Sequence, residues 1–179
     1  MSATLKNYNG IAPTLNKGVF VEASAILYGD ITIGPDASIW PLVVARGDVH
    51  FIRLGARTNI QDGSILHVTR PSEVLPTGLP LIIGDDVTIG HKAMLHACTV
   101  GNRVLIGMGT IILDGVVIED DVMVGAGSLV PPGKTLVSGY LYVGSPVKQA
   151  RPLTAAEKAF LPASAANYVR LKNEYLNSR

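Results

Sequence analysis

Three histidines, His67, His91 and His96, lie close to one another in the sequence, and the fourth, His50, precedes them. Imidazole nitrogens bind divalent metals, and three neutral imidazoles suit Zn(II) because they leave coordination positions open for water. Fe(II) and Co(II) accept the same donors. We therefore interpret His67, His91 and His96 as candidate metal ligands. The alternative is that they are separate surface or hydrogen-bonding side chains, which is how we interpret His50.

The elements that must position these histidines are indicated by an aliphatic residue at every sixth position. A helix repeats near 3.6 residues and a strand near 2, so neither accounts for this period. A six-residue unit fits a short strand and a turn, and three units make one triangular coil with its aliphatic side chains inside. Stacked coils then lie about 4.8 Å apart, as strands do in a sheet. The repeating positions are Ile33, Ile39, Ala45, Leu54, Ile60, Leu66, Ile83, Ile89, Leu95, Val100, Ile106, Ile112, Ile118, Val124 and Val130.

This repeat predicts an all-β solenoid over residues 1–150. It is typical of the hexapeptide class of parallel β-helices, which wind left-handed and are an exception to the usual handedness of crossovers. The widest interruption of the repeat is rich in proline and glycine. We therefore expect a loop near residues 68–81 to leave the solenoid.

Residues 151–179 predict a C-terminal α-helix that packs on the outside of the same domain. Thr154 followed by Glu157 is a capping box, which marks the start of the helix. Pro162 should kink or split the helix, because proline removes a backbone donor. The apolar positions expected to cover the solenoid are Phe160, Leu161, Val169, Leu171, Tyr175 and Leu176.

Equal positions of successive coils stack on one face of a solenoid. The residue after the third aliphatic position is Arg46, His67 and His96 in turn, and two imidazoles stacked about 4.8 Å apart can share one metal ion. His91 occupies another slot, which Asp62 occupies one coil earlier, so it faces a neighbouring edge. A second chain related by a threefold axis would bring its own His91 to the pair. We therefore expect a homotrimer with metal sites at its subunit interfaces.

Polar residues beside these slots are candidates for supporting roles. The amide of Gln61 could orient a metal-bound hydroxide or a substrate. Asp62 could accept a hydrogen bond from His91 and hold it in place. Arg46 and Asp48 could pair, and we interpret them as a structural salt bridge between protomers rather than as catalytic groups.

Composition excludes several classes of function. Hydrophobic residues make up 47% and charged residues 16% of the 179 residues, and the formal net charge of +1 indicates neither nucleic-acid nor membrane binding. The single cysteine, Cys98, excludes an internal disulfide, and its slot favours a buried side chain. The polar start of the chain does not match a signal peptide, and no apolar run could span a bilayer. We expect a cytoplasmic protein.

Several motifs resemble those of the γ-class carbonic anhydrase family, and most closely its YrdA-like branch. The matching stretches are residues 46–49, 59–63, 66–67, 90–96 and 144–147. The hexapeptide repeat alone is shared with many acyltransferases, whereas the three histidines together with the Arg-x-Asp and Asn-x-Gln-Asp-Gly motifs are specific. The resemblance covers nearly the whole chain.

This resemblance implies a left-handed β-helix trimer that binds Zn or Fe at its interfaces through His67, His96 and a neighbour's His91. It also implies that Gln61 lies beside a metal-bound water. In such proteins a tyrosine of the C-terminal helix approaches the site, and Tyr168 is the match. Arg46 and Asp48 would stabilise the interface, so the resemblance assigns them an assembly role.

The implied reaction is hydration of CO2 to bicarbonate by a metal-bound hydroxide. This reaction would make the protein a carbonate dehydratase-like lyase. The sequence departs from the active members of the family where they carry two glutamates that export protons. Val49 and Arg70 stand at those positions, and neither side chain shuttles protons near neutral pH. Glu73, in the expected loop, could substitute. We therefore expect low turnover.

Three other functions fit parts of the same pattern. The metal could support hydrolysis of an acyl-CoA thioester, with Gln61 and Tyr168 flanking the attacking group. The trimer could instead be a structural or assembly subunit that keeps the metal for stability. A hexapeptide acyltransferase would share the repeat but use a histidine as general base, and grouping of three histidines for a metal argues against it.

Overall fold

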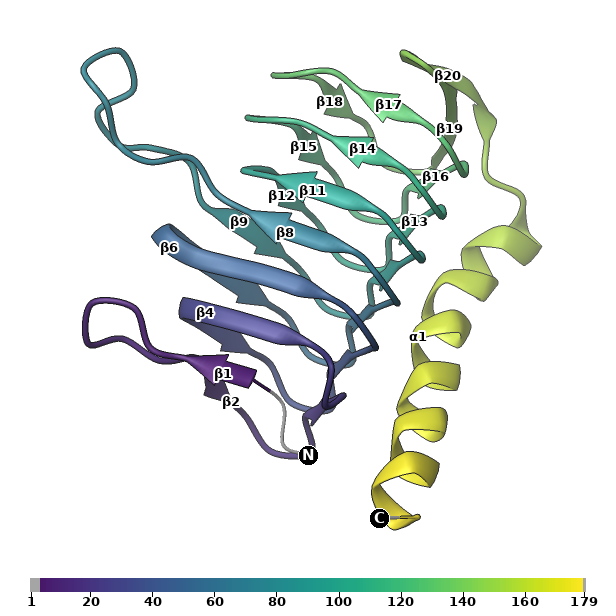
Figure 1. Ribbon diagram of the computed structural model, residues 1–179. Helices are drawn as coiled ribbons and strands as arrows, with labels where there is room; N and C mark the ends of the chain where they lie inside the picture. The colour runs from purple at the N-terminus through teal and green to yellow at the C-terminus, as the bar shows by residue number, and fades with distance from the viewer. Residues whose placement is uncertain (1–3, 179) are drawn as a thin grey trace.

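Short strands separated by turns follow one another along the chain, as the six-residue period predicts. The computed structural model describes residues 4–178, and in it these strands wind into a left-handed parallel β-helix with one helix on its outside (Figure 1). Each coil has three sides, and the strands on each side pair in parallel with those of the coils before and after. The predicted fold class is thereby confirmed.

The three sides of the prism are named here face 1, face 2 and face 3. Face 1 holds β1 (Thr4–Lys6), the first halves of β4 (Ile26–Ile33) and β6 (Val44–Leu54), then β8 (Ile65–His67), β11 (Met94–His96), β14 (Ile111–Ile112) and β17 (Leu129–Val130). Face 2 holds β2 (Thr14–Leu15), the second halves of β4 and β6, then β9 (Leu81–Ile83), β12 (Thr99–Val100), β15 (Val117–Ile118) and β18 (Thr135–Leu136). Face 3 holds β3 (Phe20–Val21), β5 (Ser38–Ile39), β7 (Asn59–Ile60), β10 (Thr88–Ile89), β13 (Leu105–Ile106), β16 (Met123–Val124) and β19 (Tyr140–Gly144).

The core is a set of aliphatic columns along the axis of the prism. On face 3, for example, Ile60, Ile89 and Ile106 are in register and fully buried. The other two faces contribute equivalent columns, and the buried residues form one continuous cluster. Burial of each such side chain contributes about 1.5–3 kcal/mol, so the repeat itself supplies the stability of the fold.

Two loops leave the solenoid at the corner between faces 1 and 2 (Figure 1). Residues 7–13 connect β1 to β2, and residues 68–80 connect β8 to β9, as the proline-rich interruption predicts. An antiparallel bridge between Thr69 and Leu79 closes the base of the longer loop. His50 holds the same loop through a contact of 3.1 Å between its Nε2 and the carbonyl oxygen of Thr77, so this histidine has a structural partner.

The C-terminal end of the solenoid is closed by an antiparallel hairpin that the repeat does not foresee. Strand β20 (Val147–Pro152) folds back on β19 after the cis peptide bond between Ser145 and Pro146. The chain then enters helix α1 (Ala155–Asn177), with the expected capping box of Thr154 and Glu157. No helix within residues 4–178 is long and apolar enough to cross a membrane.

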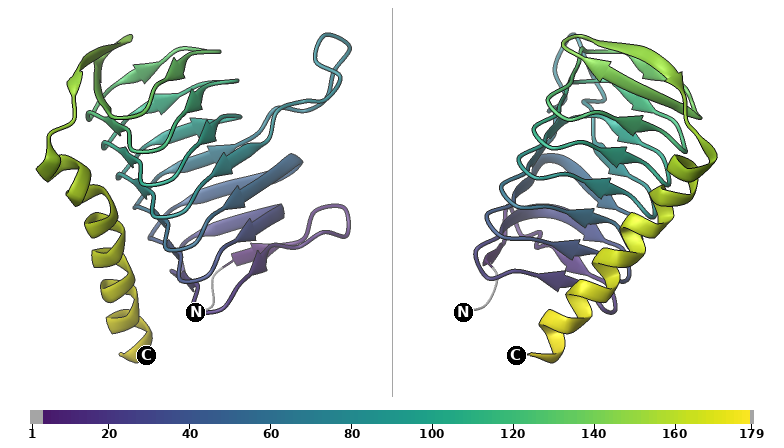
Figure 2. Two further views of the ribbon diagram at one scale, coloured as in Figure 1. Left: turned by 180° about the vertical axis from the view of Figure 1, so that it is seen from behind. Right: turned by 90° about the vertical axis from the view of Figure 1, so that its right-hand side faces the viewer.

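Helix α1 runs along face 3, where it packs against β5 and β10 (Figure 2). It continues unbroken through Pro162, so the expectation that this proline splits it is wrong. The buried Leu161 and Ala165 hold the helix to the solenoid on both sides of the proline, and this packing outweighs the missing hydrogen bond.

The buried side of the helix also differs from the apolar pattern. Phe160, Leu171 and Leu176 are exposed, whereas Ser164 and Lys172 are buried. The ammonium group of Lys172 lies 2.9 Å from Oδ1 of Asp36 and 2.7 Å from Oδ1 of Asn173. The helix is thus fixed by polar contacts as well as by apolar ones.

Candidate metal centre

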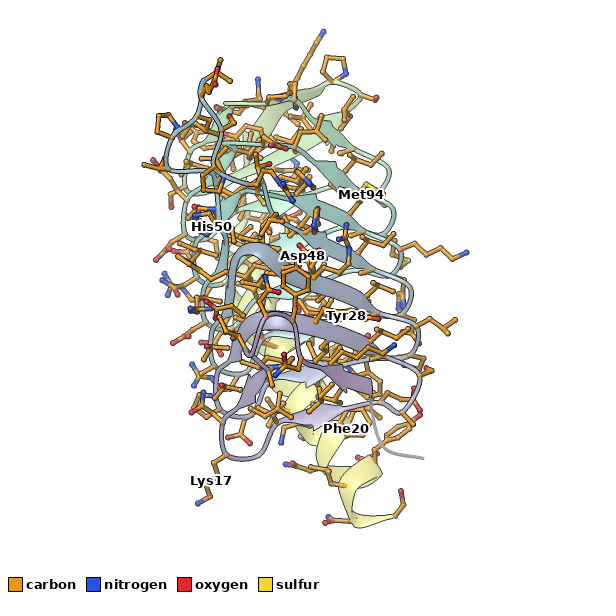
Figure 3. All side chains as sticks on the ribbon, turned by 60° about the vertical axis from the view of Figure 1, so that its left-hand side comes forward. Lys17, Phe20, Tyr28, Asp48, His50 and Met94 are labelled. Atoms are coloured by element: carbon orange, nitrogen blue, oxygen red, sulfur yellow. The ribbon has the colours of Figure 1, made fainter. Side chains whose placement is uncertain are left out.

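Strands β8 and β11 end with His67 and His96 side by side at the corner between faces 1 and 2. The two residues are register partners, and Nδ1 of His67 lies 3.1 Å from Nε2 of His96. Ala45, one coil earlier, pairs with Leu66, so Arg46, which follows Ala45, extends the column of His67 and His96 by one coil. The structure thus has the alignment that the period predicts. In Figure 3, which views this corner, Asp48 lies between Met94 and Tyr28 on one side and His50 on the other.

Each of these two imidazoles has a carboxylate on its other ring nitrogen. Nε2 of His67 lies 3.0 Å from Oδ1 of Asp48, and Nδ1 of His96 lies 2.6 Å from Oδ1 of Asp114. A neutral imidazole carries one N–H, and an ionised carboxylate accepts but cannot donate, so each ring places its N–H on the carboxylate side. The two facing nitrogens then both carry lone pairs. Two lone pairs 3.1 Å apart favour a cation between them.

The protonation of the groups fits this arrangement. Burial lowers the pKa of His67 below its ordinary value and outweighs the hydrogen bond to Asp48, which acts in the opposite direction. Burial opposes ionisation of both Asp48 and Asp114. The hydrogen bond to His67 and the charge of Arg46 nevertheless lower the pKa of Asp48, and hydrogen bonds to Thr69 and His96 lower the pKa of Asp114. Near neutral pH the lowered pKa values therefore pair a neutral His67 with an ionised Asp48, and Asp114 is ionised as well.

Asp114 was not among the residues that the sequence singled out. It directly follows Leu113, which occupies the slot of His67 and His96 in the next coil, so the repeat places it beside the histidine column. Thr69, at the base of the long loop, also donates a hydrogen bond to Asp114. An acidic residue next to a histidine column is the signal that would have found it.

His91 lies at another corner, between faces 3 and 1. Its Nδ1 is 2.8 Å from Oδ2 of Asp62, the contact expected from their shared slot. The N–H is directed to the carboxylate in this pair too, which leaves Nε2 with a lone pair. Strand β11 crosses face 1 between His91 and His96, so the two corners of one chain are separated by the width of that face.

Gln61 and Tyr168 lie with His91 rather than with His67 and His96. All three line a cavity of about 240 Å³ between α1 and the solenoid, together with Leu105, Met108 and Phe160. Gln61 is buried, and its Nε2 donates a hydrogen bond to Oδ1 of Asn59 at 3.1 Å. Burial and the charge of Asp62 raise the pKa of Tyr168, so its phenol stays protonated near neutral pH.

Known proteins resemble this chain over nearly its whole length. Protein YrdA of Escherichia coli is 60% identical over 99% of this chain and 96% of its own. The chain belongs to the YrdA-like branch of the γ-class carbonic anhydrase-like hexapeptide-repeat family. Gamma carbonic anhydrase 2 of Arabidopsis thaliana is 45% identical over 94% of this chain, which spans 60% of that relative's length.

The structural and motif comparisons place this YrdA-like chain among hexapeptide proteins. A hexapeptide transferase family protein from Anaplasma phagocytophilum has a TM-score of 0.90 and 41% identity, covering 98% of this chain and 99% of that one. The family described as bacterial transferase hexapeptide (six repeats) matches residues 97–132.

The other residues that the sequence singled out lie in different surroundings. Arg46 pairs with Asp48 within one chain, because both side chains leave the same strand two residues apart, and a contact of this pair with a second subunit stays a prediction. Cys98 is buried, and burial raises the pKa of its thiol. Val49 packs on the core, and Arg70 and Glu73 are exposed on the loop.

The donor set fits a metal of the kind that γ-class proteins imply. Two nitrogens bound to one tetrahedral Zn(II) lie roughly 3.3 Å apart, given Zn–N bonds of about 2.0–2.1 Å. The measured separation of 3.1 Å between the facing nitrogens of His67 and His96 is close to this value. Within residues 4–178 of a single chain, no group of three or more His, Cys, Asp or Glu side chains is arranged to hold a metal ion. His91, the third candidate ligand, lies at the other edge of face 1 and so does not join His67 and His96 within one chain.

Proposed function

We propose that the protein is a homotrimer that binds one divalent metal ion at each subunit interface and hydrates CO2 to bicarbonate. The observation that carries the proposal is the pair of facing ring nitrogens of His67 and His96, each ring held by a carboxylate on its other nitrogen. Three imidazoles suit Zn(II), and Fe(II) or Co(II) accept the same donors.

The outer surface of face 1 supports assembly. An apolar stripe runs along it in register, and its middle members Ile65, Met94 and Ile111 are 42%, 40% and 39% exposed. Apolar patches of this kind mark interfaces. The full stripe is Ile26, Val44, Ile65, Met94, Ile111 and Leu129.

The edges of face 1 explain why a ring of subunits would complete the site. His91 lies at the edge where the strands begin, and His67 and His96 lie at the edge where they end. A contact between unlike edges repeats around a threefold axis and closes a ring. Each interface would then join His67 and His96 of one subunit to His91 of the next.

The chain's own residues then divide the work of the reaction. A divalent metal supplies Lewis acidity, which lowers the pKa of a water toward about 7. Gln61, fixed through Asn59, would orient the reacting oxygen with its amide. The apolar wall of Leu105 and Met108 would exclude bulk water from the cavity beside His91. Val49 and Arg70 provide no proton shuttle, so we expect slow turnover.

A second candidate function, hydrolysis of an acyl-CoA thioester, is favoured by the cavity that Gln61 and Tyr168 share. Its volume of about 240 Å³ is several times that of a water molecule, about 30 Å³, and its apolar wall suits an acyl chain. CO2 would fill only a small part of it. Gln61 and the protonated phenol of Tyr168 would lie on either side of a thioester carbonyl.

The test combines metal analysis with two assays on protein purified anaerobically and reloaded with Zn(II), Fe(II) or Co(II). We expect about one metal per chain and slow CO2 hydration, both lost in His67→Ala. Gln61→Ala should keep the metal but lower the rate of CO2 hydration about 10- to 100-fold, because it removes one hydrogen bond to a charged group. The matched control is Gln149→Ala, at an exposed glutamine, which should keep both the metal and the rate. Metal without hydration, together with acyl-CoA hydrolysis, would favour the second candidate, and absence of metal would contradict both.

A further inference from the structure

Leu42 combines an unusual backbone conformation with an exposed apolar side chain. Its φ is +60°, and its relative exposure is 66%. Leucine is rarely found in the left-handed region, because its Cβ crowds the backbone there. Glycine or lysine takes the same turn position in later coils, at Gly63, Lys92, Gly109 and Gly127. A strained and exposed leucine in this position points to a contact outside the chain.

A cavity that suits a leucine side chain lies at the corner between faces 1 and 2. It has a volume of about 380 Å³ and an apolar lining formed by Tyr8, Ile11, Val49, Phe51 and Pro71. Ile11 is half exposed, and no segment of the described chain fills the opening.

The register of the solenoid relates Leu42 to this cavity. Backbone hydrogen bonds stack Pro41, Asp62 and His91 in one column, with Gly63 N–H donating to Pro41 and Lys92 N–H to Asp62. Leu42 therefore lies two coils before His91 at the same corner of the prism.

In the proposed trimer, His91 of one subunit lies at the level of His96 in the next subunit. His67 of that next subunit lies one coil before its His96. Two coils nearer the N-terminus, the column of His91 contains Pro41, which Leu42 follows. In the other column, Arg46 lies two coils before His96 and Tyr28 lies two coils before His67, because Tyr28 pairs with Arg46 and Arg46 precedes His67. At that level the cavity opens, lined by Gly47, Asp48 and Asp30 besides the apolar residues.

We propose that Leu42 of each subunit inserts into this cavity of the next subunit. The contact is a second set of interface anchors two coils from the metal, and it rests on the proposed trimer. Burial of the leucine on association accounts for its exposure in a single chain. The turn that carries it is held by the Ser24 hydroxyl, which accepts the N–H of Leu42 at 3.1 Å, so the side chain is presented in advance.

The test is the oligomeric state of Leu42→Glu by analytical ultracentrifugation over a concentration series. The introduced carboxylate would face Asp30 and Asp48 in the cavity, and loss of one buried leucine weakens each contact about 10- to 100-fold. We expect a folded monomer where the wild type is a trimer. Val137→Glu, at an exposed apolar residue far from the cavity, should leave the trimer intact.

Two further variants separate this contact from a folding effect. Leu42→Gly relieves the positive φ, so the monomer should be at least as heat-stable as wild type although its trimer is weaker. Leu42→Glu combined with Ile11→Lys should restore the trimer by pairing the new charges. The Leu42 contact would be contradicted if the folded Leu42→Glu protein trimerised like wild type, or if Ile11→Lys failed to restore assembly. Either result would leave the proposed trimer itself standing. A monomeric wild type would overturn the proposed trimer as well.

Discussion

At the scale of residues, two carboxylates decide what His67 and His96 can bind. Asp48 and Asp114 each accept the single N–H of a neutral ring, and this leaves two lone pairs facing one another 3.1 Å apart. Without the carboxylates, either ring could turn its N–H toward the other, and the pair would be an ordinary hydrogen bond. The aspartates thus give the pair of histidines the arrangement of lone pairs that the proposed metal site requires.

Asp114→Asn tests this role. The amide cannot accept as strongly from Nδ1 of His96, so we expect metal affinity to fall about 10- to 100-fold with little change in fold. Competition with a fluorescent chelator measures the affinity. Asp85→Asn, which removes a carboxylate that accepts a backbone N–H of Ala56 away from the histidines, is the matched control. Equal affinities for the two variants would show that Asp114 plays no part.

His67 provides a prediction about pH. Burial lowers its pKa below 6.5, so the folded protein binds fewer protons at this residue than the unfolded chain as pH falls through 6.5. The metal-free protein should therefore lose stability as pH falls from 6.5 toward the lowered pKa, and His67→Gln should lose less. NMR titration of the imidazole should place its midpoint below that of a free histidine. A midpoint above 6.5 would contradict the sign of the shift.

At the scale of elements, helix α1 is linked to Gln61 through a buried polar chain. Nε2 of Gln61 donates to Asn59, Nδ2 of Asn59 lies 3.0 Å from the Thr88 hydroxyl, and that hydroxyl lies 2.9 Å from the hydroxyl of Ser164 on α1. Hydrophobic periodicity does not predict this series of polar contacts, because the helix buries Ser164 and Lys172 while it exposes Phe160. Sequence patterns find apolar faces, and they do not show which polar side chains of a helix are buried against its partner.

Ser164→Ala should destabilise the protein by about 1–3 kcal/mol, because it removes a partner from a buried hydroxyl. Urea denaturation followed by circular dichroism measures the loss. The neighbouring Ala163→Ser, at an exposed position of the same helix, should change stability by less than about 0.5 kcal/mol. If Ser164→Ala also lowers activity by the same factor as Gln61→Ala, these hydrogen bonds position the amide of Gln61 as well as the helix. Unchanged stability would show that the helix does not depend on this link.

At the scale of the whole molecule, the six-residue period accounts for most of what was predictable. It places aliphatic residues in inner columns, and the same arithmetic aligns Arg46, His67 and His96 on one corner and Asp62 with His91 on another. Side-chain pairing at the corner was less accessible. The Arg46–Asp48 pair closes within one chain, and Asp114 entered only with the structure, since a period fixes which residues stack but not which rotamers meet.

The most direct test of a metal site shared between subunits uses two inactive variants. His91→Ala lacks the donor at one edge of face 1, and His67→Ala lacks a donor at the other, so neither homotrimer should hold metal at its sites. Unfolding the two proteins together and refolding them would form mixed trimers, in which one interface joins an intact His67–His96 pair to an intact His91. We predict about one metal ion in each mixed trimer, against about three in the wild type, when tagged mixtures are purified and analysed for metal. Mixed trimers that hold no metal would contradict the shared site.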